Sequence, residues 1–205
     1  QFSGKLDCDW MMRHAEKKTK LTDWGDLQFQ EPFRIFMNSL QQEAQLSNRG
    51  KFVVIQHYTR LLCNILKIVE DWKRYPEIGR VPLKDPIFII GFPRTGTTFL
   101  HSLLAQDSSF RSLQYWELLF PSPPPDPQTY HSDPRIRQAQ QFVFWINIIS
   151  PRLAAIHELK ATGAEECCFI FDHFFLDNIH DPVFHVPTYI QWYRQHDPAA
   201  SYRFH

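Results

Sequence analysis

The feature that most constrains the fold is an apolar run, followed by a loop with a glycine at each end and then by an amphipathic segment. Residues 87–90 are Ile-Phe-Ile-Ile, and such a continuous apolar run is typical of a strand covered on both faces of a parallel sheet. Gly91 and Gly96 bound the loop, and residues from about 97 to 106 have apolar positions at helical spacing. Strand, loop and helix in this order begin α/β phosphate-binding domains. The sequence therefore predicts an α/β fold, with a P-loop-like parallel sheet flanked by helices.

The loop itself predicts an anion site. A loop between a strand and a helix directs backbone N–H groups and the positive helix end at one point, where phosphate or sulfate binds. Thr97 and Thr98 add hydroxyl donors, and Arg94 adds a planar cationic group. The glycine spacing matches the G-x-x-x-x-G-K-[ST] loop of nucleotide triphosphatases, but Thr97 stands where that loop has lysine. Because this lysine contacts the β- and γ-phosphates, we do not expect hydrolysis of ATP or GTP.

The part of the chain before the apolar run is expected to be helical. Acidic, basic and apolar residues alternate at helical spacing over 7–20, and apolar residues recur at three- and four-residue steps over about 30–47 and 51–73. Two domains are therefore expected: a helical N-terminal region at 1–80, and an α/β domain at 81–205.

Three further elements are expected after the loop. Residues 133–149 predict a helix, since an aspartate and then a proline stand at its start. Residues 153–157 predict a short strand. A further helix is expected to begin at Gly163, with Glu165 and Glu166 favourably placed at its positive end.

Composition excludes several classes of protein. Lys and Arg total 22, as do Asp and Glu, so the chain lacks the basic field of a general nucleic-acid binder. No apolar run reaches the roughly 20 residues needed to span a bilayer. Neither the four cysteines nor the ten histidines are spaced like metal ligands, and the cysteines do not form a disulfide framework. We expect no nucleic-acid partner, membrane span or metal. The cytoplasm is favoured, although a chain that starts without Met says little about a signal peptide.

At this point the sequence resembles a known family. The stretch PRTGTTFLHSLL is similar to the 5′-phosphosulfate-binding loop of sulfotransferases that use 3′-phosphoadenosine 5′-phosphosulfate (PAPS), in the group with Arg rather than Lys at the position of Arg94. The resemblance continues in order through FRSLQYWELLFPSPPP, SDPRI and HELKATGAEEC. It implies transfer of a sulfuryl group from PAPS, as co-substrate and without a metal, to a hydroxyl or amine. The acceptor would be a small-molecule or carbohydrate-like compound.

The resemblance also implies site residues. Arg94 would stabilise the charge that develops during transfer, in addition to binding the donor. The residues implied to hold the 5′-phosphosulfate are Pro93, Arg94, Thr95, Gly96, Thr97 and Thr98.

The acceptor needs a general base, and two residues are candidates. Glu117 lies where a glutamate acts as base in the Arg-loop sulfotransferases, so the resemblance favours it. His157 lies at a distance from the loop comparable to that of a histidine in the cytosolic enzymes, and an imidazole needs little pKa tuning near neutral pH. We therefore expect Glu117, with His157 as the alternative.

Other functions stay open at this stage. A nucleotide or small-molecule kinase with a degenerate phosphate loop is one, and a non-catalytic binding protein that retains the loop is another. The W-x-L-K-S-P and H-R-D-P stretches that carry the 3′-phosphate site in the resembled group are not found. We therefore expect a chain that is incomplete at both ends, lacks the C-terminal part of the α/β domain, binds PAPS weakly and is inactive alone.

Overall fold

The computed structural model describes residues 6–82, 84–92, 94–152, 157–176 and 180–205. By contact density the chain divides into two compact units, Gln1–Arg74 with Cys168–His205, and Tyr75–Cys167. We refer to them as the first and the second unit. The domain boundary expected at residue 80 stays a prediction.

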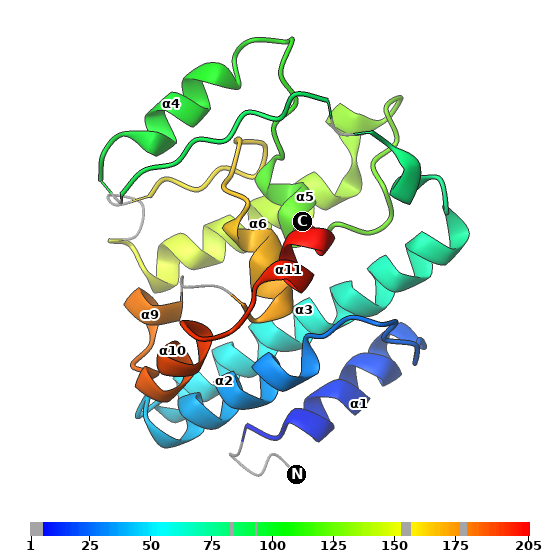
Figure 1. Cartoon of the computed structure of the whole chain (residues 1–205). Coiled ribbons are helices and arrows are strands. Elements are labelled where there is room, and N and C mark those ends of the chain that lie inside the picture. Colours follow the sequence, from blue (N-terminus) through cyan, green and yellow to red (C-terminus); the bar gives the residue numbers. More distant parts are fainter. Residues whose placement is uncertain (1–5, 83, 93, 153–156, 177–179) are drawn as a thin grey trace. The chain divides into compact units, whose positions relative to one another are not determined.

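All regular secondary structure among the described residues of the first unit is helical. Its N-terminal part begins at α1, whose first turn is capped by the side chain of Asp7, which accepts a hydrogen bond from the backbone N–H of Trp10. The second predicted helix ends earlier than expected, at Gln42. The helices are α1 (Cys8–Thr19), α2 (Gln30–Gln42), α3 (Asn48–Arg74), α8 (Cys168–Phe171), η3 (Asp172–Phe174), α9 (His180–Val183), α10 (Pro187–Tyr193) and α11 (Ala199–Phe204) (Figure 1).

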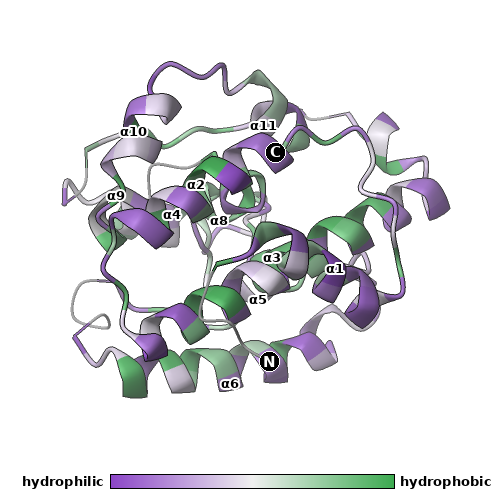
Figure 2. Ribbon diagram, turned by 90° about the horizontal axis from the view of Figure 1, so that it is seen from below, coloured by the Kyte–Doolittle hydropathy of each residue, from purple (hydrophilic) through white to green (hydrophobic). Residues whose placement is uncertain are grey.

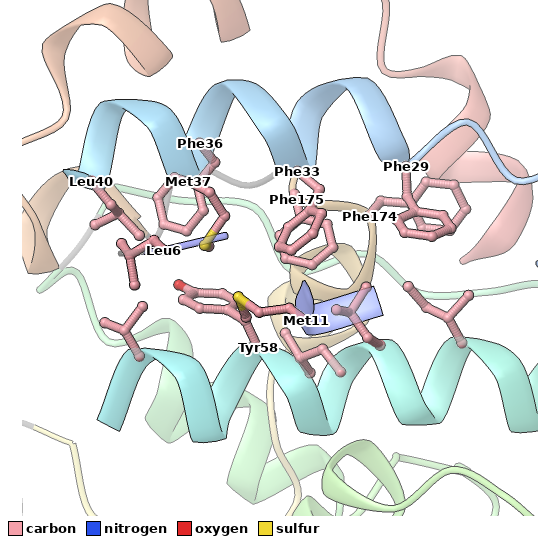
Figure 3. Packing of buried hydrophobic residues seen from close by; sticks show 14 of the residues in the cluster. Leu6, Met11, Phe29, Phe33, Phe36, Met37, Leu40, Tyr58, Phe174 and Phe175 are labelled. Carbon is pink, nitrogen blue, oxygen red and sulfur yellow. The ribbon is translucent and has the colours of Figure 1, made fainter. Parts of the chain in front are cut away.

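The core of the first unit lies between α2 and α3. Apolar residues three and four positions apart lie on one side of each helix, so each helix has a single apolar face to bury. Figure 3 shows side chains of α2 directed towards α3, with the ring of Tyr58 among them. The fully or almost fully buried side chains of these two helices include Phe33, Phe36, Met37, Leu40, Tyr58, Leu61, Leu62 and Ile65.

The C-terminal segment completes this core. The ring centroids of Phe33 and Phe175 are 4.6 Å apart, and the hydroxyl of Tyr189 donates to the backbone carbonyl oxygen of Phe175 at 2.8 Å. Phe174 and Tyr189 are fully buried. Phe174, Phe175 and Tyr189 therefore belong to the core, and Phe184 packs against it.

Helix α3 is long and apolar enough to cross a bilayer by length and composition alone, and it is the single described helix that is so. The core helix of a globular unit passes the same test, and 56% of the apolar window of α3 is buried within the structure. Its apolar face packs against α1 and η3, and the ring of Phe36 in α2 contacts that of Tyr58, which makes α3 a core helix here.

A buried polar cluster also belongs to the first unit. Asp172 lies 3.0 Å from Nε2 of His57, and this hydrogen bond helps to hold the pKa of Asp172 below its ordinary value even though burial opposes it. His173 uses both ring nitrogens in its neutral form, with Nδ1 on the carbonyl oxygen of Phe169 at 2.9 Å and Nε2 beside the side-chain amide of Asn64 at 3.1 Å. A second proton on His173 would break one of these contacts.

The second unit contains the predicted loop and the elements that follow it. Helix α6 begins as expected, since the side chain of Asp133 accepts from the N–H of Arg135 at 2.9 Å and Pro134 occupies the first helical position. Its C-terminal half is apolar (Figure 2) and carries exposed Phe144 and Trp145. The elements are η1 (Ile78–Arg80), α4 (Thr97–Leu104), α5 (Tyr115–Leu119), η2 (Tyr130–Ser132) and α6 (Pro134–Ile149).

The predicted parallel sheet is wrong. Residues 86–92 have no strand assignment, and the one β-bridge among the described residues is an isolated antiparallel pair, Gln114 with Ala164. The apolar run at 87–90, which was expected to be buried on both faces, is exposed: Phe88 is 67% and Ile90 is 91% exposed. An apolar run becomes a strand only when another strand satisfies its backbone groups, and none of the described residues does so here.

Two smaller expectations concern residues 153–166. The helix expected to begin at Gly163 is wrong, because Ala164 forms the β-bridge and the next helix, α8, begins at Cys168. The short strand expected at 153–157 falls, except for its last residue, outside the described residues.

We predict that the first unit loses stability on acidification. Burial lowers the pKa of His173 and of His180 from 6.5 to about 4. Between these pH values the unfolded chain binds more protons than the folded one, so the free energy of unfolding falls as pH drops from 6.5 towards 4. Urea unfolding across this range measures it. His173→Gln should flatten the dependence, whereas the exposed His185→Gln should not. A urea midpoint of the wild type that does not change between pH 6.5 and 4 would contradict the lowered pKa values of His173 and His180.

Candidate functional site

The loop before α4 is tightly turned, and its glycines are required by geometry. Gly96 has φ of 92° and Arg94 has φ of 68°, both in the left-handed region, which costs a non-glycine residue energy. The hydroxyl of Thr95 donates to the carbonyl oxygen of Phe92 at 2.6 Å and closes the turn. A Cβ on Gly91 would lie 2.8 Å from Cγ2 of Thr97 and 3.0 Å from Oγ1 of Thr95, so a larger residue there would displace these two side chains.

The loop leads directly into the N-terminus of α4. Gly96 is the N-cap residue and has no side chain to cap the first turn. Arg94, Thr95 and Thr98 are exposed, and Thr97 is half-buried. Backbone N–H groups at a helix start, together with a guanidinium and hydroxyl donors, form an arrangement that binds phosphate or sulfate. Pro93, the sixth residue predicted for this site, lies outside the described residues.

Glu117 lies in α5 and is buried, with 5% of its surface exposed. Oε1 accepts from Arg111 at 2.5 Å. Oε2 accepts from the backbone N–H of Gln114 at 2.8 Å and from the hydroxyl of Tyr130 at 2.7 Å. The bond to Gln114 is half of a capping box that fixes the start of α5. Both carboxylate oxygens are therefore already used within the protein.

The same contacts act on Tyr130. Burial and the hydrogen bond to Glu117 raise the pKa of Tyr130 to about 12. The phenol therefore stays protonated and keeps donating to the carboxylate at neutral pH.

His157 is paired with a buried carboxylate that the sequence analysis did not assign to the site. Nε2 of His157 lies 2.8 Å from Oε1 and 3.1 Å from Oε2 of Glu165. Glu165 is only 6% exposed, whereas the imidazole is part-buried. The hydrogen bond from Glu165 raises the pKa of His157, although partial burial opposes it.

The next residue, Glu166, contacts the loop helix. The hydroxyl of Thr98, in the first turn of α4, donates to Oε1 of Glu166 at 3.3 Å. Residues 165 and 166 therefore connect the base candidate His157 on one side with the predicted anion loop on the other. No hydrogen bond or ion pair joins Glu117 to Thr98 or to His157 among the described residues.

A short antiparallel pairing positions these groups. The backbone N–H of Tyr115 donates to the carbonyl oxygen of Gly163 at 3.0 Å, and that of Glu165 donates to the carbonyl oxygen of Leu113 at 3.0 Å. This pairing sets the start of α5 beside the segment that carries Glu165. One signal in the sequence points to Glu165, its place with His157 in the stretch HELKATGAEEC, but the two acidic residues after Gly163 favour a helix start instead.

Among the residues that the structure describes, no group of three or more His, Cys, Asp or Glu side chains is arranged to hold a metal ion. The chemistry that this arrangement offers is binding of an anion, together with proton transfer by an imidazole or a carboxylate.

Comparison with known proteins relates this chain to sulfotransferases. A family model described as "Sulfotransferase family" matches residues 86–205. The chain is similar to the crystal structure of sulfotransferase STF1 from Mycobacterium tuberculosis H37Rv, with 31% identity and a TM-score of 0.84 over 96% of this chain and 55% of that chain. For sulfotransferase STF9 from Mycobacterium avium the identity is 25% and the TM-score 0.86, over 100% of this chain and 53% of that chain. This chain spans about half the length of both. The comparison with curated proteins gave no match.

We predict that Glu117→Gln destabilises the second unit. The substitution removes the ion pair with Arg111 and weakens the capping box, which should lower the free energy of unfolding by roughly 1–3 kcal/mol. It should also lower the pKa of Tyr130 from about 12 towards 10.0. Urea unfolding and the absorbance of tyrosinate during alkaline titration measure the two effects.

Glu158→Gln is the matched control for Glu117→Gln. Glu158 pairs with Lys160 at 3.0 Å, but both side chains are 66% exposed, so the loss should stay within about 1 kcal/mol. Equal stability of the two variants, with an unchanged tyrosine titration, would show that the Glu117 network does not stabilise the unit.

Proposed function

This chain belongs to the sulfotransferase family, and we propose that it supplies the 5′-phosphosulfate site of an enzyme that transfers a sulfuryl group from PAPS to an acceptor hydroxyl or amine. The acceptor is a small molecule or a carbohydrate-like compound. The single observation that carries the proposal is the backbone conformation of the described loop residues 91–92 and 94–98. A glycine-dependent turn with left-handed Arg94 runs into the uncapped start of α4.

The proposed reaction is a direct displacement at sulfur. The acceptor oxygen attacks the sulfur atom and forms a new S–O bond while its proton passes to a base. The bond between sulfur and the bridging phosphate oxygen breaks, and its electron pair leaves with adenosine 3′,5′-bisphosphate. Negative charge accumulates on the bridging oxygen. Arg94, the hydroxyl of Thr97 and the backbone N–H groups at the start of α4 would stabilise it, as fixed donors do in other group transfers.

We assign the base role to His157 in preference to Glu117. A base must be reached by the acceptor, and the Glu117 carboxylate is 5% exposed, with its charge paired to Arg111 and further donors at Gln114 and Tyr130. Among the described residues, the contacts of the His157 ring are made by Nε2, which faces Glu165. Nδ1 is therefore the nitrogen that would take the acceptor proton. This reverses the preference drawn from the resemblance and is supported by contact geometry.

The loop proposal is tested by ligand binding. We predict that the chain, at ligand concentrations high enough for weak binding, is protected from thermal unfolding by adenosine 3′,5′-bisphosphate and much less by ATP, because Thr97 replaces the phosphate-loop lysine. Gly91→Ala should abolish the protection, since the added Cβ would collide with Thr97.

Gly79→Ala is the control for Gly91→Ala, because a Cβ there meets nothing within 4 Å. It should bind like the wild type. Strong protection by ATP with none by the bisphosphate would overturn the sulfotransferase site and favour a kinase with a degenerate loop.

The base assignment is tested by sulfuryl transfer in the full-length protein. We predict that His157→Gln lowers kcat by roughly 10²–10⁴-fold, the usual contribution of a positioned base. The wild-type rate should rise with pH through the pKa of His157, because the neutral imidazole is the active form and Glu165 holds this pKa above 6.5.

Glu117→Gln should instead act through stability, and should regain activity under conditions in which it is fully folded. A folded Glu117→Gln enzyme without activity, beside an active His157→Gln enzyme, would restore Glu117 as the base.

A further inference from the structure

Glu165 is a buried carboxylate whose main partner is an imidazole. Taking a carboxylate out of water is costly unless its oxygens are compensated. The described contacts of the Glu165 carboxylate are the imidazole of His157 and the backbone N–H of Glu166, 3.2 Å from Oε2. No Lys or Arg pairs with Glu165 among the described residues. Its one strong partner is therefore a residue already proposed to act on the acceptor.

The backbone of Glu165 is fixed independently of its side chain. Its N–H donates to the carbonyl oxygen of Leu113 at 3.0 Å, next to the bridge between Gln114 and Ala164. The carboxylate therefore projects from a fixed point, and it can orient a ring rather than follow it.

The contact determines which nitrogen of His157 carries the proton. An ionised carboxylate only accepts hydrogen bonds, so the nitrogen that faces it must carry hydrogen. Nε2 faces both oxygens of Glu165. In the neutral imidazole the lone pair then lies on Nδ1, on the other side of the ring, which is the form that a general base needs.

Position links this pair to the donor loop. Glu166 follows Glu165 directly and accepts from the hydroxyl of Thr98 in the first turn of α4. Thr98 is one of the residues proposed to hold the phosphosulfate. The histidine and its carboxylate therefore adjoin the end of α4 at which the sulfuryl group would lie.

We propose that Glu165 is a positioning residue for His157, which fixes the tautomer and orientation of the imidazole so that Nδ1 takes the proton of the acceptor beside the loop. This rests on the proposed function. In the step, the acceptor proton bonds to Nδ1, Nε2 keeps its proton in the hydrogen bond to Glu165, and the imidazolium later releases the Nδ1 proton to water. No oxidant, reductant or further reactant is involved.

The charged groups that act on His157 are Glu165, through a hydrogen bond and its charge, and Glu166, through its charge alone. Both favour the imidazolium, while partial burial opposes it. Removing the charge of Glu165 must therefore lower the pKa of His157.

The first arm of the test needs no enzymatic activity. Titration of His157 by NMR in this chain should give a lower pKa in Glu165→Gln than in the wild type. Glu158→Gln is the matched control, since this exposed carboxylate is close to His157 in the sequence but pairs with Lys160. An unchanged pKa in Glu165→Gln, or an equal fall in both variants, would overturn the proposal.

The second arm measures sulfuryl transfer in the full-length protein. Glu165→Gln should lower kcat by about tenfold or more, by less than His157→Gln, and should move the pH–rate profile to lower pH. KM for the acceptor should change little. Glu165→Asp, which keeps the charge, should recover part of the rate, and it replaces the Gln variant if that variant does not fold. An unshifted profile with wild-type kcat would overturn the positioning role.

The two arms separate the failure of this proposal from that of the proposed function. A wild-type protein that transfers no sulfuryl group from PAPS refutes the proposed function, and with it the catalytic use of the pair. A wild-type protein that is active while Glu165→Gln matches it in both arms refutes the positioning role alone.

Discussion

Three backbone hydrogen bonds between residues 113–116 and residues 161–165 hold the candidate site together. They run from Tyr115 to Gly163, from Trp116 to Ala161 and from Glu165 to Leu113, at 2.9–3.0 Å. On one side of this pairing α5 begins. On the other side the chain carries the carboxylates that contact His157 and Thr98. These few hydrogen bonds fix the segment that carries Glu165 and Glu166, whose side chains contact His157 and Thr98.

The two carboxylates proposed for the base differ in what surrounds them. Glu117 accepts hydrogen bonds from a cation, a backbone N–H and a phenol, so it stabilises the fold at the start of α5. Glu165 is equally buried but has an imidazole as its main partner, so its charge is directed at a titratable group. A buried carboxylate that is paired with a cation and backbone groups has a role in stabilising the fold. One that is paired with a part-buried histidine beside an anion loop is a functional candidate.

The sequence predicted those features whose causes are local. Gly91 and Gly96 are required by the turn they occupy, and Asp133 caps α6, because neighbouring residues alone decide both. The parallel sheet failed because an apolar run at 87–90 cannot specify the strand that must pair with it. Glu165 was mistaken for a helix start because its role depends on a pairing with residues far away in the sequence.

The central claim is that the loop before α4 holds the 5′-phosphosulfate end of the donor. Mapping backbone amide shifts by NMR while adenosine 3′,5′-bisphosphate is added tests it most directly. We expect the largest shifts at Arg94, Thr95, Gly96, Thr97 and Thr98, even where binding is weak. Shifts that are absent at high ligand concentration, or that are largest away from this loop, would contradict it.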